Sequence, residues 1–157
     1  MLTLCKQNVN PKGRVTSDCT TRAMSNVLGI SYADTLRLQY EQAMKHCYGL
    51  CDGKTTDFVM KLFGYEKQKQ PRKWNNTKYT VGELDQLLSK KQMSEGVLVT
   101  VNHHETCIRE GQVRDTWNCL NKYVGNYWIK TSEEDPSVKS IKRIEHIELG
   151  KKGRKIL

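Results

Sequence analysis

Residues 96–117, GVLVTVNHHETCIREGQVRDTW, contain three short runs rich in β-branched and aromatic residues. The runs VLVTVN, ETCIRE and QVRDTW have the composition of strands, and Glu110-Gly111 between the last two is typical of a two-residue hairpin loop. A fourth run, NYWIK, follows the turn residues Gly125-Asn126. The last third of the chain is therefore predicted to form an antiparallel sheet, to which residues 140–149 (SIKRIEHIEL) add an alternating final strand.

The chain before this sheet has apolar residues at helical spacing. The first helix is predicted over residues 18–28, with Ser17 or Asp18 as its cap and Gly29 as its end. Three further elements are predicted: a helix from residue 31 to 44, a helix over 55–63, and a capping box at 80–83 (TVGE). Helices followed by antiparallel strands predict an α+β domain.

Length and composition suit one compact domain. The chain has 157 residues, of which 37% are hydrophobic, and we assign residues 1–150 to a single domain and 151–157 to a basic tail. The apolar runs are too short to cross a bilayer, and the N-terminal residues lack a secretory signal pattern. The expected location is the cytoplasm, with no membrane partner. The six cysteines are expected to be reduced there, so that a thiol is available for chemistry.

The formal net charge of +9 raises the question of an anionic partner. Lys and Arg are dense in residues 66–73 (EKQKQPRK) and in the tail, but no nucleic-acid motif accompanies them. A solvated lysine-rich surface therefore explains the charge better than a nucleic-acid site does. Two hypotheses follow, a thiol enzyme and a basic binding module.

Cys19 stands where the first predicted helix begins. Unpaired backbone N–H groups and the positive end of the helix dipole favour the thiolate there, although the neighbouring Asp18 opposes it unless its carboxylate points away. A nucleophilic thiol needs a base, and imidazole is the usual one. Among the four histidines, His103 and His104 stand at the start of a predicted strand, and a shift of the strand by one residue exchanges their roles.

The hairpin register decides which group can orient the imidazole. If Glu110-Gly111 is a two-residue loop, paired residue numbers sum to 221, and His104 then lies opposite Trp117 and diagonal to Asp115 on one face. A three-residue loop makes the sum 220 and brings Asn118 to that face instead. The sequence leaves both registers open.

These residues belong to four short motifs, N-P, D-C-x-x-R-A, H-x-T and D-T-W-[DN]. The residues that carry them are Asn10, Pro11, Asp18, Cys19, Arg22, Ala23, His104, Glu105, Thr106, Asp115, Thr116, Trp117 and Asn118. In these motifs the chain resembles the papain-like-fold cysteine hydrolases, in particular small proteins of phages and bacteria, from residue 10 to about residue 128. The resemblance implies a papain-like α+β fold, with N-terminal helices packed on a C-terminal antiparallel sheet.

The same resemblance implies a role for each site residue. Cys19 is the expected nucleophile, His104 its base, and Asp115 the group that orients the base. Papain has a Gln six residues before its cysteine as an oxyanion donor, whereas this chain has Gly13. The candidate donors are therefore the side chains of Asn10 and Gln7, or backbone N–H groups including that of Cys19. Trp117 is the candidate wall of the substrate site, with Asn118 beside it.

The expected reaction is attack of a thiolate on an acyl group of a protein or peptide. Peptidase, deamidase and transglutaminase differ in leaving group and acceptor, and the sequence does not separate them. No cofactor and no metal are expected, because the His46, Cys47 and Cys51 cluster lacks a second ligand pair for zinc. The alternative is a non-catalytic basic module of the same fold that binds nucleic acid, a nucleotide signal or a host protein, in an anti-defence role if phage-encoded.

Overall fold

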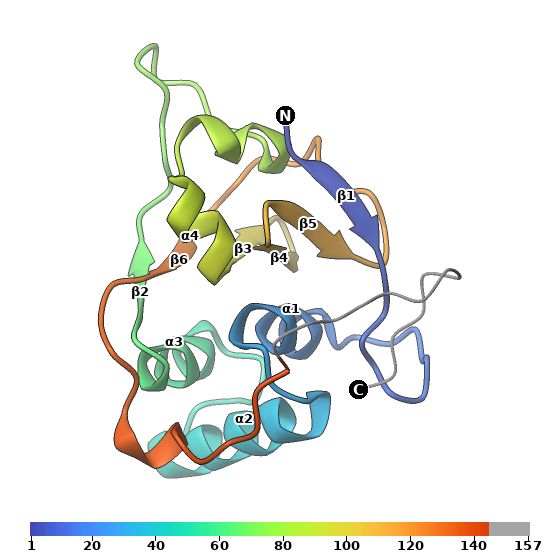
Figure 1. Ribbon diagram of the computed structural model, residues 1–157, viewed down its shortest axis with the longest axis vertical. Helices are drawn as coiled ribbons and strands as arrows, with labels where there is room; N and C mark the ends of the chain where they lie inside the picture. The colour runs from blue at the N-terminus through green and yellow to red at the C-terminus, as the bar shows by residue number, and fades with distance from the viewer. Residues whose placement is uncertain (145–157) are drawn as a thin grey trace.

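The computed structural model describes residues 1–144 and has one six-stranded sheet at its centre (Figure 1). The strand order is β1-β5-β4-β3-β6-β2. The strands are β1 (Thr3–Lys6), β2 (Tyr65–Gln68), β3 (Val97–Val101), β4 (His104–Arg109), β5 (Gln112–Asp115) and β6 (Tyr127–Lys130). The predicted α+β class is confirmed. Residues 145–149 of the strand predicted at 140–149 lie outside the described residues, and residues 140–144 form no strand.

The strands of the last third of the chain pair antiparallel, as predicted. The whole sheet is nevertheless mixed, because an N-terminal strand that was not predicted joins it. β1 runs parallel to β5, with Thr3 paired to Gln112 and Lys6 to Asp115. β2 was also not predicted, and it pairs antiparallel with β6. Both are four-residue edge strands rich in polar side chains, TLCK and YEKQ. An edge strand needs a partner on one side only and little burial, so its sequence carries a weak strand pattern.

The two hairpins of the central sheet have two-residue loops. In the first, Val101 pairs with His104 across the turn formed by residues 102 and 103. In the second, Ile108 pairs with Val113 and Arg109 with Gln112, so paired numbers sum to 221. Glu110 and Gly111 have φ values of 52° and 73°, the left-handed conformation that this short hairpin loop requires. The first of the two predicted registers is therefore the observed one.

Helices cover both faces of the sheet (Figure 1). The helices are α1 (Cys19–Leu28), α2 (Tyr32–His46), α3 (Gly53–Leu62) and α4 (Lys90–Glu95), with 3-10 helices η1 (Val81–Gln86) and η2 (Pro136–Val138). The predicted cap at Ser31 is confirmed, because its side chain accepts a hydrogen bond from the N–H of Asp34. The capping box at residues 80–83 is present but begins a 3-10 helix. None of the helices within residues 1–144 has the length and apolar character needed to cross a membrane.

α1 packs directly on the centre of the sheet. Its buried residues Met24 and Val27 join a core cluster with Leu98 of β3, Cys107 of β4 and Trp128 of β6. The alternate residues of the strands form a second cluster on the opposite face, with Val99, Ile108, Val113 and residues of η1. Because both clusters are buried, α1 is held against the centre of the sheet.

The end of α1 fixes how it meets the next helix. Gly29 adopts φ 63° and ψ 39°, and its N–H donates to the carbonyl of Ser25. Only a residue without Cβ takes this left-handed conformation without strain, so the predicted stop at Gly29 is confirmed. The N-terminus of α1, where Cys19 lies, is next to the start of β4.

Candidate functional site

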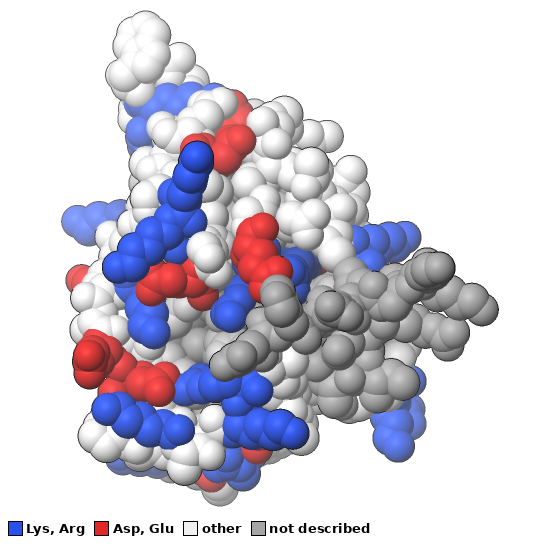
Figure 2. Space-filling model, viewed as in Figure 1, with Lys and Arg blue, Asp and Glu red and all other residues white. Residues whose placement is uncertain are grey.

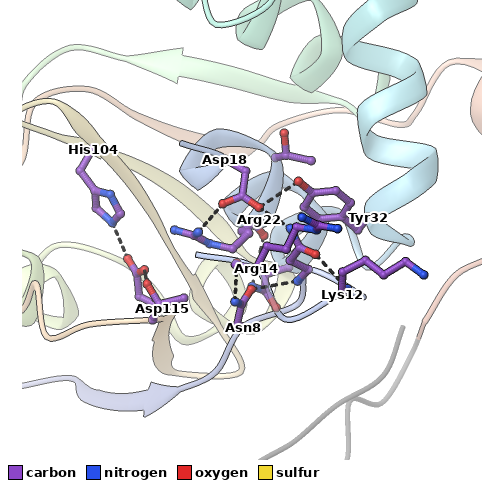
Figure 3. A network of polar contacts seen from close by, with 12 residues as sticks. Asn8, Lys12, Arg14, Asp18, Arg22, Tyr32, His104 and Asp115 are labelled. Carbon is purple, nitrogen blue, oxygen red and sulfur yellow. Dashed lines mark hydrogen bonds and ion pairs between the residues drawn. The ribbon is translucent and has the colours of Figure 1, made fainter. Parts of the chain in front are cut away.

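His104 and Asp115 form the central contact of the site (Figure 3). The Nε2 atom of His104 lies 2.6 Å from Oδ2 of Asp115. The ring of Trp117 lies beside the imidazole, with centroids 4.9 Å apart. This is the arrangement expected from the 221 register, in which diagonal residues share one face.

Cys19 lies at the N-terminus of α1, where the other side of the imidazole meets its thiol. A hydrogen bond with His104 lowers the pKa of the Cys19 thiol and outweighs the opposite effect of burial. The backbone N–H of Glu105 lowers the pKa further by donating to the sulfur. Because Nε2 is held by Asp115, Nδ1 is the ring atom left for the thiol.

The imidazole of His104 is held in its charged form. Burial opposes the charge, but hydrogen bonds with Asp115 and with Cys19 raise the pKa of His104 to about 9. A thiol with a lowered pKa beside an imidazole with a raised one favours proton transfer from the thiol to the imidazole, as in a thiolate–imidazolium pair. This pair combines a nucleophile with a proton donor for the leaving group.

Asp115 is a buried carboxylate with several donors. Burial raises the pKa of Asp115, yet hydrogen bonds from the His104 ring and from the N–H of Thr116 bring it below its usual value. The Thr116 N–H lies 2.7 Å from Oδ1. The donors keep the carboxylate charged and fixed, as a group that orients an imidazole must be.

Asp18 belongs to a buried network of its own, in which its carboxylate meets Arg22 and Tyr32 (Figure 3). Its carboxylate pairs with Arg22 and accepts hydrogen bonds from Asn10 Nδ2 at 3.0 Å and from the Tyr32 hydroxyl at 2.8 Å. It makes no side-chain cap on α1. The charge that opposes a Cys19 thiolate is therefore balanced by Arg22, and the Asp18 side chain does not occupy the first N–H groups of α1.

The side chains predicted as oxyanion donors serve the scaffold. Asn10 binds Asp18, and its Oδ1 accepts from the N–H of Lys12. Gln7 donates from Nε2 to Asn26 Oδ1 at 2.6 Å, although it does line a small inner cavity with Cys19. The backbone N–H groups at the start of α1 are the donors that remain next to the thiol.

An open cleft of about 600 Å³ contains Cys19 and His104. Trp117, 39% exposed, lines it as predicted, with residues of the 15–17 loop and Cys51 around it. Asn118 is exposed and bonds the N–H of Leu120, and it is not among the residues that line this cleft. A recess of comparable size elsewhere, lined by lysines and glutamates of α4 and residues 130–139, contains no histidine or cysteine. The cleft at Cys19 is thus the one with a nucleophile.

The remaining histidines and cysteines lie in different surroundings. His103 is exposed in the β3–β4 turn with φ 55°, so His104 and not His103 meets the thiol. His46 stacks on Phe58 with centroids 3.7 Å apart, and Cys47 and Cys51 are exposed. Among the residues that the structure describes, His104, Asp115 and Cys119 are the one group placed to hold a metal ion, with ligand atoms within 4.8 Å. Two of these ligands already bind each other.

The sequence did not identify Glu105 as a site residue. It stands between His104 and Thr106, and alternation along β4 turns it to the opposite face from His104, toward α1. Its pKa is raised to about 7, mainly by burial. The sequence shows only that Glu105 stands in a predicted strand, directly after the candidate base His104. The burial of the carboxyl itself depends on α1 packing over it.

In comparisons with protein-family models, with curated proteins and with solved structures, no match to this chain was found.

Proposed function

We propose that the protein is a cysteine-dependent hydrolase or acyl transferase of papain-like fold. The observation that carries this proposal is the series of contacts from the Cys19 thiol through His104 to Asp115, in which Nε2 lies 2.6 Å from the carboxylate oxygen. The lowered pKa of the thiol and the raised pKa of the imidazole agree with it.

The reaction follows from these positions. The Cys19 thiolate attacks a carbonyl carbon of the substrate, and the oxyanion that forms accepts hydrogen bonds from N–H groups at the start of α1. The His104 imidazolium gives its proton to the leaving amine or alkoxide, and a thioester remains on Cys19. Water or an amine, deprotonated by the now neutral His104, attacks the thioester and releases the thiol. Peptidase, deamidase and transglutaminase activities share these steps.

The substrate class is a protein or a peptide. The cleft is open at the surface and has an indole at its side, which suits an extended chain better than a small enclosed ligand. The motifs of Cys19, His104 and Asp115 resemble those of phage and bacterial proteins, so a phage or host target in the cytoplasm is part of the proposal. No cofactor is needed for the steps above.

Acylation of the thiol tests this function. The protein is mixed with p-nitrophenyl acetate, nitrophenolate release is followed, and the acetylated residue is mapped by peptide mass spectrometry. We expect a burst of nitrophenolate with an acetyl group on Cys19 that hydroxylamine removes. Nitrophenolate release at the same rate in Cys19→Ala would contradict the proposal.

A second candidate function, binding of a nucleic acid, is favoured by Trp74. This indole is 98% exposed at the tip of a hairpin that projects from the fold, closed by the pairing of Arg72 with Lys78. Figure 2 shows Lys and Arg side chains beneath the uncharged tip, with acidic side chains beside them. Exposed aromatics next to cations bind single strands by stacking. Oligonucleotide binding that weakens with salt and is lost in Trp74→Ala would support this function, and binding unaffected by Trp74→Ala would exclude this surface.

A further inference from the structure

Glu105 lies directly beside the nucleophile. Its backbone N–H donates to the Cys19 sulfur, and its carboxyl accepts a hydrogen bond from the side chain of Thr20. Both Glu105 and Cys19 line the open cleft and the small inner cavity below it. A carboxyl group is thus built into the wall of the site, on the face of β4 opposite His104.

One oxygen of this carboxyl has no partner. Oε2 of Glu105 is buried and makes no hydrogen bond, and within residues 1–144 no Lys, Arg or His lies within ion-pair distance of the carboxyl. A buried carboxylate without a donor or a cation is strongly disfavoured.

The charged groups around Glu105 are engaged elsewhere. From α1, Arg22 pairs with Asp18, and from β5, Arg114 pairs with Glu110. His104 on the same strand is bound to Asp115, and it and Lys67 of β2 act on Glu105 only through their charge. Within residues 1–144, Arg22, Arg114 and His104 already have carboxylate partners, so the described part of the chain offers no partner for Oε2 and a bound cation can supply one.

We propose that Glu105 recognises a positively charged group of the substrate, a Lys ammonium or an Arg guanidinium, next to the carbonyl that Cys19 attacks. This inference rests on the proposed role of Cys19 and specifies the substrate of the same cleft. A bound cation supplies the partner that Oε2 lacks. It also balances the charge of Glu105, which otherwise raises the pKa of the Cys19 thiol. A cationic substrate thereby favours the thiolate that attacks it, whereas a neutral or acidic one does not.

Charged thiol reagents test this inference without a known substrate. The Cys19 thiolate attacks the sulfenyl sulfur of a methanethiosulfonate, a disulfide forms, and methanesulfinate leaves. The reagents carry a 2-aminoethyl group (cationic), a 2-sulfonatoethyl group (anionic) or a methyl group (neutral). The labelling rate of each cysteine is measured by peptide mass spectrometry in the wild type, in Glu105→Gln, and in Glu66→Gln, which removes one charge from an exposed position of β2.

The quantity to compare is the ratio of the cationic to the anionic rate at Cys19. We expect Glu105→Gln to lower this ratio at least about tenfold, which corresponds to ~1.4 kcal/mol. Glu66→Gln should leave it unchanged, and the ratio at the exposed Cys47 should not respond to either substitution. Since both rates share the same thiolate, any change in the Cys19 pKa cancels in the ratio.

The preference should also depend on pH. Burial raises the pKa of Glu105 to about 7, so the cationic preference should increase from about pH 6 to about pH 7.5 as the carboxyl ionises. The His104 pKa of about 9 keeps the imidazole charged over this range. In Glu105→Gln the ratio should be flat.

Two outcomes would overturn the inference: a ratio unchanged by Glu105→Gln, or an anionic preference in the wild type that Glu105→Gln leaves in place, as His104 alone would produce. If Glu105→Gln does not fold, as judged by fast labelling of buried Cys107 with the neutral reagent, Glu105→Asp is used and must keep the cationic preference. Slow labelling of Cys19 by every reagent would instead argue against the nucleophile, and the charge ratio would still report on Glu105.

Discussion

Two groups of cysteines lie around Asp115 and have opposite properties. Cys19, at the start of α1, has a lowered pKa because its hydrogen bond with His104 outweighs burial. Burial, with the nearby charge of Asp115, raises the pKa of Cys107 to about 12 and of Cys119 to about 11. Cys119 Sγ even contacts the same carboxylate oxygen as His104, at 3.6 Å. A carboxylate thus activates a thiol through an imidazole and suppresses one that it touches directly.

The largest expected effect is the loss of thiol acylation when Cys19, and not Cys107 or Cys119, is replaced by Ala. Cys19→Ala should abolish thiol acylation by an activated ester, because the other thiols are either protonated at neutral pH or lack an adjacent base. Cys107→Ala and Cys119→Ala should retain it. Steady-state nitrophenolate release measures all three variants. Equal activity in Cys19→Ala, or loss in Cys119→Ala with the fold intact by circular dichroism, would reverse the assignment.

Removing the Asp115 carboxylate should make the reactivities of Cys19 and Cys119 more alike. The Asp115 carboxylate orients His104 and raises the pKa of its imidazole. Because Asp115→Asn removes this acceptor, kcat is expected to fall about 10²–10⁴-fold. The same change removes a charge that raises the pKa of Cys119, so that thiol should alkylate faster. Asp34→Asn on α2 serves as the control. A loss of less than about tenfold would mean that His104 does not depend on Asp115.

The ion pair next to Cys19 should contribute to stability as well as to the site. Arg22→Met leaves the buried Asp18 carboxylate without its cation, and we expect a loss of about 3–5 kcal/mol in the free energy of unfolding. The double variant Arg22→Met with Asp18→Asn should recover part of it. Arg37→Met on the exposed face of α2 is the matched control, with a loss below about 1 kcal/mol. Urea denaturation at neutral pH gives these values, and equal losses at both arginines would contradict a buried pair.

The smallest expected effect concerns Glu105 and pH. Its pKa is 4.5 in the unfolded chain and about 7 in the folded one, so only the folded protein keeps the proton between these values. The stabilising contribution is complete below the lower value and is lost as pH rises through the upper one, a change of about 2–3 kcal/mol. Glu105→Gln should show a flatter dependence of unfolding free energy on pH over this window. Parallel curves for the two proteins would show that the carboxyl ionises normally.

The part of the fold that follows local rules was predictable. Gly29 at the end of α1, the Ser31 cap and the Glu110-Gly111 loop each depend on backbone preferences of one or two residues. The loop also determined the site, because a two-residue connection places His104 and Asp115 on one face. A one-residue change in its length would have separated them.

The remaining features depend on contacts between distant segments. β1 forms because it pairs with β5, about a hundred residues later in the chain. Its four residues, TLCK, are too few to show an alternating strand pattern. The pairing of Asp18 with Arg22 and Tyr32, and the burial of Glu105 under α1, likewise arise only when the helix meets the sheet. Propensity and spacing describe single elements, so they cannot show which polar groups become buried between elements.

The most direct test of the thiolate–imidazolium pair is the rate of iodoacetamide alkylation at each cysteine as a function of pH, in the wild type and in His104→Ala. At about pH 6 we expect Cys19 to react at least about tenfold faster than an ordinary thiol, since its lowered pKa leaves a larger fraction of it as thiolate. In His104→Ala the rate should fall to that of an ordinary thiol and rise only near pH 8.5. A Cys19 rate that rises only near that pH in both proteins would contradict the pair, and with it the proposed thiol chemistry.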